Sequence, residues 1–333
     1  MPRIFAFIVH KAGVADDSAV ELAAAAARID PAQAPTAIVT GYGLELDAVC
    51  NGLRATYGEI WKIADEALAY PNAELVRQAL VAVVPPGSIL LVPHSHFGVD
   101  LSPGLSIKLN AAYVPDVVGI DGLDDSALRL VRQEFGGQVS THVRCEISDG
   151  AVVNIRPGAF QPAGGASLSG VVVDKSGELG TLKTARRYLQ TIPVDAGDVD
   201  ITKYRTLVSI GRGIQDPENV ALAEELAQAM GAAVSCSRPV VDAKWLDKSR
   251  QVGSSGKTVK PKVYLACGIS GSFQHLAGIK GNPFLIAINK NPKAPIFRVA
   301  DVGIVDDIIE FLPALTERVR EECCAPVQGK EQR

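Results

Sequence analysis

Residues 262–281 read "KVYLACGISGSFQHLAGIKG", and this stretch decides how the C-terminal half of the chain is interpreted. The apolar run Val263–Cys267 predicts a buried strand, which ends in glycine and serine residues at 268–272. A lone histidine, His275, follows about one helical turn later. Small residues at the end of a strand let a ligand approach the backbone closely. A phosphate group, a scissile bond and a flavin ring are all compatible with this pattern.

Three further predicted strands in this half also end in glycine or polar residues. Gly211-Arg212-Gly213 begins at the end of "TLVSIG", Ser237-Arg238 at the end of "AAVSCS", and Asn289-Lys290 at the end of "FLIAIN". Strands that alternate with helices predict a parallel sheet, here a doubly wound Rossmann-like (DHS-like) domain. Ligands bind to such sheets at the carboxyl ends of the strands. Four strands that end in this way therefore predict a ligand site.

The N-terminal half also alternates between strand-like and helix-like segments, which predicts an α/β domain with a mostly parallel sheet. Predicted strands and helices alternate at 3–9, 18–28, 36–41, 44–57, 59–65, 72–83, 88–94 and 101–112. Between 128 and 160, shorter extended runs are interrupted by Gly136-Gly137 and by Asp149-Gly150. These dipeptides are typical of turns, so antiparallel hairpins are expected there.

Domain boundaries follow from a polar seam at 192–203, "IPVDAGDVDITK", which has no helical period. We predict an N-terminal α/β domain at 1–198, a C-terminal domain at 199–322 and a flexible polar tail at 323–333. A chain of 333 residues exceeds what one small core accommodates, which also favours two domains.

Composition excludes several classes of protein. The net charge is −4, so there is no basic excess to bind nucleic acid. No apolar run approaches the roughly 20 residues that a transmembrane helix needs, and the N-terminal sequence does not resemble a signal or transit peptide. The six cysteines are scattered, which is typical of reduced thiols. We therefore expect a soluble, cytoplasmic protein.

Other catalytic motifs are incomplete. Around Ser270 the fifth position of the Gly-x-Ser-x-Gly elbow is Ser272, so a hydrolase nucleophile is not favoured. The stretch "QVGSSGKT" has Gln251 where a Walker loop has its first glycine, and no hydrophobic strand precedes it. It is interpreted as a cradle of small residues for an oxygen-rich ligand. The pairs His94/His96 and His142/Cys145 lack the third ligand of a metal site and are interpreted as structural.

In its C-terminal half the chain resembles the α subunit of electron transfer flavoprotein, a group that includes the bacterial FixB-like proteins. The likeness is dense over about 206–320 and loose before it. The segments that carry it are "SIGRGI", "SRPVVDAKW", "QVGSSGKTVKPKVYLACGISGSFQHLAGIKG", "AINKNPKAPIF" and "VADVGIVDD".

The resemblance implies that the C-terminal domain binds FAD. The residues it places at the flavin are Arg212, Ser237, Arg238, Val252, Gly253, Ser254, Ser255, Gly256, Ser270, Gly271, Ser272, Phe273, Gln274, His275, Asn289, Asp307 and Ile308. It implies that Arg212 lies over the isoalloxazine and favours its negatively charged reduced form. His275 is expected at the pyrimidine edge and Ser255 at N(5), both tuning the flavin. Ser270–Ser272 are expected to bind the pyrophosphate at a helix N-terminus, and Asn289 the sugar hydroxyls.

Two serines depart from the family pattern. The family's usual Gly-Gln-Thr-Gly-Lys loop is Gly253-Ser254-Ser255-Gly256-Lys257 here. Ser255 keeps the hydroxyl of the usual threonine without its methyl group, and Ser254 reaches less far than glutamine. Phe273 replaces a usual aliphatic residue. These departures affect the expected flavin potential rather than FAD binding.

The resemblance also implies partners. A β subunit that carries AMP or a second FAD is expected to pack against both domains, with the N-terminal domain as its platform. Electrons are expected from flavin dehydrogenases such as the acyl-CoA dehydrogenases of fatty acid β-oxidation, and are passed to a quinone oxidoreductase or another acceptor. The chain is thus expected to be an electron carrier rather than a stand-alone enzyme. An electron-bifurcating complex that uses NADH and a non-redox nucleotide-binding module remain alternatives.

Overall fold

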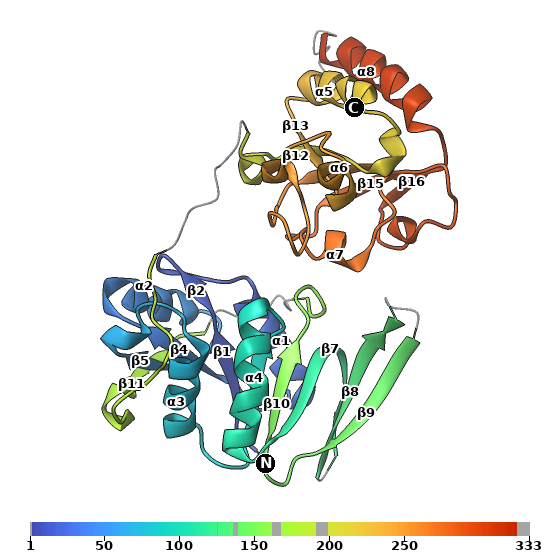
Figure 1. The fold of residues 1–333 in the computed structure, drawn as a ribbon. Coiled ribbons are helices and arrows are strands. Elements are labelled where there is room, and N and C mark those ends of the chain that lie inside the picture. Colours follow the sequence, from blue (N-terminus) through green and yellow to red (C-terminus); the bar gives the residue numbers. More distant parts are fainter. Residues whose placement is uncertain (1, 125, 136–138, 162–167, 191–198, 325–333) are drawn as a thin grey trace, which may run out of the picture. The chain divides into compact units, whose positions relative to one another are not determined.

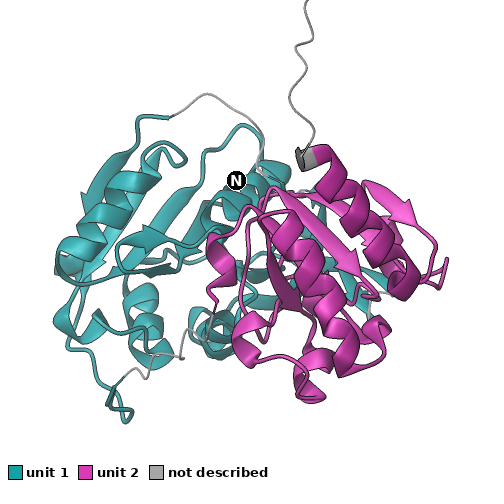
Figure 2. Ribbon diagram, turned by 90° about the horizontal axis from the view of Figure 1, so that it is seen from above, with its two compact units in different colours: residues 1–190 teal, residues 191–333 magenta. Residues whose placement is uncertain are grey.

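The computed structural model describes residues 2–124, 126–135, 139–161, 168–190 and 199–324. The chain forms two compact units, Met1–Gln190 and Thr191–Arg333 (Figure 2). The predicted seam at 192–203 falls mostly on 191–198, which lie outside the described residues. The division between the units therefore lies within eight residues of the predicted boundary after residue 198.

Unit 1 is built on a nine-stranded sheet of order β11-β5-β4-β1-β6-β10-β7-β8-β9 (Figure 1). The pairs from β11 to β7 are parallel, while β7–β8 and β8–β9 are antiparallel. The strands are β1 (Ile4–Ile8), β4 (Thr36–Gly41), β5 (Glu59–Ala64), β6 (Ile89–Pro93), β7 (Ala112–Leu123), β8 (Ala127–Glu134), β9 (Val139–Glu146), β10 (Ala151–Ile155) and β11 (Val171–Asp174). The continuous apolar runs of β1 and β6 are buried throughout, as parallel strands covered on both faces require.

Two layers of helices enclose this sheet. Helices α1 (Ser18–Ile29) and α2 (Gly43–Leu53) contribute to one apolar core, and α3 (Ala73–Val83) and α4 (His96–Leu109) to the other. A short hairpin of β2 (His10–Lys11) and β3 (Val14–Ala15) follows β1. The predicted mostly parallel α/β organisation is confirmed.

The structure corrects several expectations for unit 1. Asp149-Gly150 does not form an antiparallel hairpin, because β10 lies between β6 and β7 and is parallel to both. The helix predicted at 101–112 begins at His96, where the Ser95 hydroxyl accepts a hydrogen bond from the Gly98 amide. The helix predicted at 44–57 ends at Leu53, and β11 was not predicted. The Gly136-Gly137 turn lies outside the described residues.

Unit 2 contains a five-stranded sheet of order β13-β12-β14-β15-β16 in which every pair is parallel. Its strands are β12 (Thr206–Ile210), β13 (Ala233–Cys236), β14 (Val263–Cys267), β15 (Phe284–Ile288) and the unpredicted β16 (Val302–Ile304). Helices α5 (Val220–Ala229) and α8 (Ile308–Cys324) pack on one face (Figure 1). The other face is covered by the segment 252–259, by α7 (Phe273–Leu276) and by Ile296.

The ends of the unit 2 helices follow local signals in the sequence. A 3-10 turn at Pro217–Asn219 leads into α5, whose apolar stripe is buried and which Gly231 terminates with a φ of +61°. Helix α8 continues to Cys324, so the backbone of the first two residues of the predicted tail is helical. The rest of that tail, 325–333, lies outside the described residues. No helix in the described part of the chain is long and apolar enough to cross a membrane.

Candidate functional site

The strand order of unit 2 places a topological switch point between β12 and β14. From β12 the chain extends first to β13 on one side and then to β14, β15 and β16 on the other. The connections leave in opposite directions at this point, which is where open parallel sheets bind ligands. The predicted site residues follow the carboxyl ends of all five strands. The structure therefore brings the predicted segments to one edge of one sheet.

Backbone hydrogen bonds hold this edge together beyond the strands. The amide of Gly211 donates to the carbonyl of Cys267 at 2.9 Å, and the amide of Gly268 donates to Ile288 at 2.8 Å. The amide of Asn289 donates to Ile304 at 3.1 Å. The loops after β12, β14 and β15 are thus fixed relative to one another.

Glycines are required where the loops after β12 and β14 meet. A Cβ atom at Gly211 would lie 2.3 Å from the carbonyl oxygen of Gly268, and one at Gly213 would lie 2.7 Å from the Cα of Gly268. Gly268 itself has a φ of +65°. Because backbone contacts backbone here, no side chain fits between the loops. Arg212, between the two glycines, is exposed and free to contact a ligand.

The loop after β14 is held against the segment that contains Ile296. The amide of Ile296 donates to the carbonyl of Ser270 at 3.0 Å, and a Cβ at Gly271 would lie 2.5 Å from the Ile296 nitrogen. Ser270 and Ser272 remain exposed. The expected pyrophosphate site at a helix N-terminus is corrected here. Helix α7 is only four residues long, so few peptide dipoles add up at its start. The available groups are the serine hydroxyls and individual backbone amides.

The loop at 251–257 is fixed from both ends. The Val252 amide donates to Cys236 at 2.9 Å, and the Ser254 amide donates to Gln274 at 2.7 Å. Inside the loop, Nε2 of the buried Gln251 donates to the hydroxyl of Ser255 at 2.8 Å. The loop thus presents Ser254, Ser255 and Gly256 to solvent, while Val252 and Gly253 are buried supports.

Arg238 and Asp307 lie at the two outer strands of this edge. Arg238, after the buried Ser237, begins α6 (Arg238–Asp242) and pairs with Asp242 at 3.4 Å. Asp307 pairs with Lys290 at 2.6 Å, and this hydrogen bond lowers the pKa of the carboxyl.

Asn289 and Ile308 have structural contacts. Nδ2 of Asn289 donates to the Ile269 carbonyl at 3.0 Å, and its Oδ1 accepts from the Asn291 amide at 2.9 Å. One Nδ2 hydrogen is left for a ligand. Ile308 is 2% exposed and packs beneath Gly268, so it supports the loop rather than forming its surface. Phe273 and Gln274 are exposed on α7.

His275 is buried rather than displayed on the surface. Its Nε2 lies 2.8 Å from the hydroxyl of Tyr264, and its Nδ1 has no hydrogen-bond partner among the described residues. Burial lowers the pKa of His275 to about 4, an effect that the backbone of Val252 partly offsets. The ring is therefore neutral at pH 7, and Nδ1 is the nitrogen left for a ligand.

Sequence reasoning missed the residues that hold His275 and the loops. Tyr264 and Ser209 bond to each other beside the histidine, and Gln251 orders the serine loop. Lys257, at the end of the small-residue loop, lies 3.6 Å from Asp200. Tyr264 and Ser209 could have been noticed in the sequence, because each is a polar residue within a mostly apolar strand.

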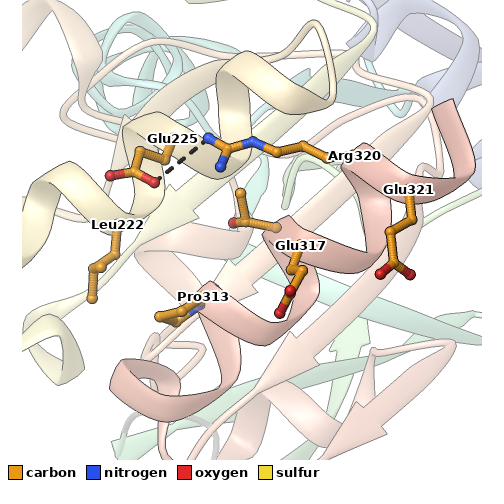
Figure 3. Close-up of a pocket in the computed structure, with 7 residues that line it drawn as sticks. Leu222, Glu225, Pro313, Glu317, Arg320 and Glu321 are labelled. Carbon is orange, nitrogen blue, oxygen red and sulfur yellow. Dashed lines mark ion pairs between the residues drawn. The ribbon is translucent and has the colours of Figure 1, made fainter. Parts of the chain in front are cut away.

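Two of the histidines considered as metal ligands, His94 and His142, lie beside carboxylates. His94 is 3.8 Å from Asp116, and Nδ1 of His142 is 3.0 Å from Asp121. No group of three or more metal-binding side chains occurs within the described ranges. A separate hollow of about 410 Å³ lies between α5 and α8, where Glu225 pairs with Arg320 (Figure 3). It contains none of the predicted site residues.

The fold and this edge define a class of protein: a parallel α/β domain with a ligand site at its switch point. Comparison with known families narrows the class. Residues 200–280 match the electron transfer flavoprotein FAD-binding domain, and residues 4–178 match the electron transfer flavoprotein domain.

Similar proteins extend over most of the chain. The electron transfer flavoprotein subunit alpha of Methylophilus methylotrophus is 34% identical over 93% of this chain and 97% of its own length. Protein FixB of Clostridium saccharobutylicum is 36% identical over 78% of this chain and 80% of its own. The probable mitochondrial subunit alpha of Cryptococcus neoformans is 32% identical over 93% of this chain. The chain belongs to the electron transfer flavoprotein α-subunit family.

Unit 2 is accordingly an FAD-binding domain, and the residues at its edge fit that cofactor. The glycine contacts leave the backbone open to close approach, and exposed serine hydroxyls suit a pyrophosphate. Arg212 and Arg238 provide positive charge. The unpartnered Nδ1 of His275 is a buried polar atom that a ligand would satisfy.

Removing the Ser255 hydroxyl is expected to weaken FAD binding. In Ser255→Ala the amide of Gln251, 3% exposed, loses its partner, and the dissociation constant of FAD should rise about tenfold. Ser255→Thr keeps the hydroxyl and should bind FAD within about threefold of the wild type. Equilibrium titration with flavin-stripped complex measures both. Equal affinity in the alanine variant, or flavin loss in the threonine variant, would show that the loop is built differently.

Proposed function

We propose that this chain is the α subunit of a heterodimeric electron transfer flavoprotein. It takes electrons from flavin dehydrogenases such as acyl-CoA dehydrogenases and passes them to a quinone oxidoreductase or another acceptor. The observation that carries the proposal is the convergence of the predicted flavin residues at one edge of the FAD-binding domain. FAD supplies the redox chemistry, and the chain binds the cofactor, orients it and sets its surroundings.

The residues at the edge are proposed to divide the cofactor between them. Ser270 and Ser272 bind the pyrophosphate, and the free Nδ2 hydrogen of Asn289 binds a sugar hydroxyl. Arg212 lies over the ring system, where its charge favours reduced, negatively charged flavin. Ser255 offers its hydroxyl hydrogen to the ring while its oxygen accepts from Gln251. Each role uses a group that the structure leaves with hydrogen-bonding capacity or exposed charge.

The β subunit is proposed as an obligatory partner, with unit 1 as its platform and AMP or a second FAD as its own ligand. The cytoplasm is proposed as the compartment. Cys50, Cys145, Cys236 and Cys267 are buried free thiols, which suits a reducing environment. Fluorescence of the tagged chain in cells tests this location, and a periplasmic or organellar signal would contradict it.

The electron donor is tested by rapid mixing. An acyl-CoA dehydrogenase reduced by its substrate is mixed without oxygen with the αβ complex, and flavin absorbance is followed. Bleaching of the complex at a rate that depends on dehydrogenase concentration supports the carrier function. No bleaching by acyl-CoA dehydrogenases of different chain-length preference would contradict this donor. Direct bleaching by NADH would favour the bifurcating alternative, and a complex that takes up no FAD would favour the non-redox module.

A further inference from the structure

A buried polar network lies directly beneath the candidate flavin site. The hydroxyl of Tyr264 is 2.7 Å from Oγ of Ser209 and 2.8 Å from Nε2 of His275. The tyrosine and histidine rings are tilted by 58° with centroids 6.1 Å apart. Tyr264 and Ser209 are fully buried, and His275 is 4% exposed. Polar groups buried this deeply are unfavourable unless they satisfy one another.

The sheet register places this network on one face. Ser209 of β12 is paired with Ser235 of β13, and Leu207, two residues before Ser209, is paired with Tyr264 of β14. Because side chains alternate along a strand, Tyr264, Ser209 and Ser235 all point to the face that α7 covers. Helix α7 places His275 over them. The network is thus assembled from three adjacent strands and the loop that contains the predicted flavin ligands.

Both ionisable members of the network are neutral near pH 7. Burial lowers the pKa of His275 to about 4 and raises the pKa of Tyr264, although Ser209 and Ser235 partly oppose the latter. A neutral imidazole carries one proton, on either Nδ1 or Nε2, and the bond made by one nitrogen decides the state of the other. With the proton on Nε2, a bare Nδ1 would be buried with no donor among the described residues, which is unfavourable. The backbone of Val252 favours a protonated ring.

We propose that Tyr264 is a positioning residue that donates its phenolic hydrogen to Nε2 of His275 and so holds the imidazole proton on Nδ1. Either hydroxyl of the Tyr264–Ser209 pair can donate to the other, because both hydrogens rotate about their C–O bonds. In this arrangement Ser209 donates to the Tyr264 oxygen, which leaves the phenolic hydrogen for Nε2. The histidine then presents an N–H donor through the one ring nitrogen that the network leaves available. That this donor serves FAD rests on the proposed function, whereas the position of the proton does not.

The proton position is measured by nitrogen NMR. Long-range ¹H–¹⁵N spectra of the αβ complex with labelled histidine distinguish a protonated ring nitrogen from a bare one, and His275→Gln assigns the signals. The wild type is expected to show protonated Nδ1 and bare Nε2. Tyr264→Phe removes the donor, so at least half of the His275 rings should carry the proton on Nε2. The same variant should raise the dissociation constant of FAD about three- to tenfold.

Ser209→Ala is the matched control, because it removes a buried hydroxyl from the network but leaves Tyr264 free to donate to Nε2. It should retain the proton on Nδ1. A wild-type ring protonated on Nε2, or a Tyr264→Phe spectrum like the wild type, would overturn the positioning role alone. A shifted tautomer with unchanged FAD affinity would overturn its link to the flavin. A wild-type complex without FAD would overturn the proposed function, whatever the tautomer.

Discussion

Gly211→Ala is expected to destabilise unit 2 and to release FAD. The added methyl carbon would lie 2.3 Å from the Gly268 carbonyl oxygen, so the loops after β12 and β14 must separate. Both contacting groups are backbone, and no rotamer change relieves the overlap. The free energy of unfolding should fall by about 3 kcal/mol, the upper end for overpacking. Separation also moves Arg212, and the FAD dissociation constant should rise at least about tenfold.

Gly52→Ala is the control for this substitution, because a Cβ at Gly52 meets nothing within 4 Å and the residue lies in helix α2. It should leave FAD affinity unchanged and stability equal or slightly higher. Denaturant unfolding and flavin titration measure both variants. A Gly211→Ala complex with wild-type stability and full flavin content would mean that the loops do not meet through their backbones.

Unit 2 is expected to lose stability in mild acid because of His275. The pKa of this group is lowered from 6.5 to about 4 in the folded chain, so the unfolded chain binds the proton first as the pH falls. The free energy of unfolding is unaffected by His275 above about pH 6.5. It falls progressively as the pH is lowered to about 4, where the loss reaches about 3 kcal/mol. At pH 5 about 2 kcal/mol of this should already be lost.

The comparison of wild type with His275→Gln isolates this effect from the carboxylates that also titrate. The chain has two tryptophans, Trp61 in unit 1 and Trp245 in unit 2, so a Trp61→Phe background lets Trp245 report on unit 2. Between pH 7 and pH 5 the wild type should lose about 2 kcal/mol more than His275→Gln. His142→Gln, at an exposed histidine of unit 1, should leave the acid response of unit 2 unchanged. Equal losses in wild type and His275→Gln would contradict the buried neutral state.

Much of the fold was predictable because parallel strands are apolar runs between helices. The strands β1, β6, β12, β14 and β15 were all identified from such runs, and the helices α5 and α8 from their apolar stripes. Which strands are neighbours in the sheet was harder to predict. Asp149-Gly150 favours a hairpin locally, but β10 is buried along its whole length by lying between β6 and β7. Long-range burial outweighed the local turn preference.

The start of α4 shows a second limit. The predicted start was residue 101, whereas the helix begins at His96 and includes Gly98. In the fold, a Cβ at this position would lie 2.0 Å from the Pro93 carbonyl oxygen. The glycine is therefore present for close packing of the helix against its preceding strand, and the Ser95 cap begins the helix. The sequence alone does not show whether a glycine ends a helix or allows close packing within it.

The candidate site was also predictable only in part. Which segments meet was predictable, because carboxyl ends of parallel strands share an edge. Where individual side chains point was not. His275 lies on a single helical turn between loops, and its inward direction depends on Tyr264, eleven residues away and in another element. The same holds for Ser255, whose oxygen is engaged by Gln251 within the loop.

FAD binding by the proposed αβ complex is tested by the flavin content of this chain co-purified with its β subunit. A visible spectrum is recorded, and the released flavin is identified and counted per heterodimer. An FAD spectrum is expected, with one FAD per heterodimer, or two if the β subunit carries its own. A correctly folded heterodimer that contains no FAD and takes up none when it is added would contradict the assignment of unit 2 as its FAD-binding domain.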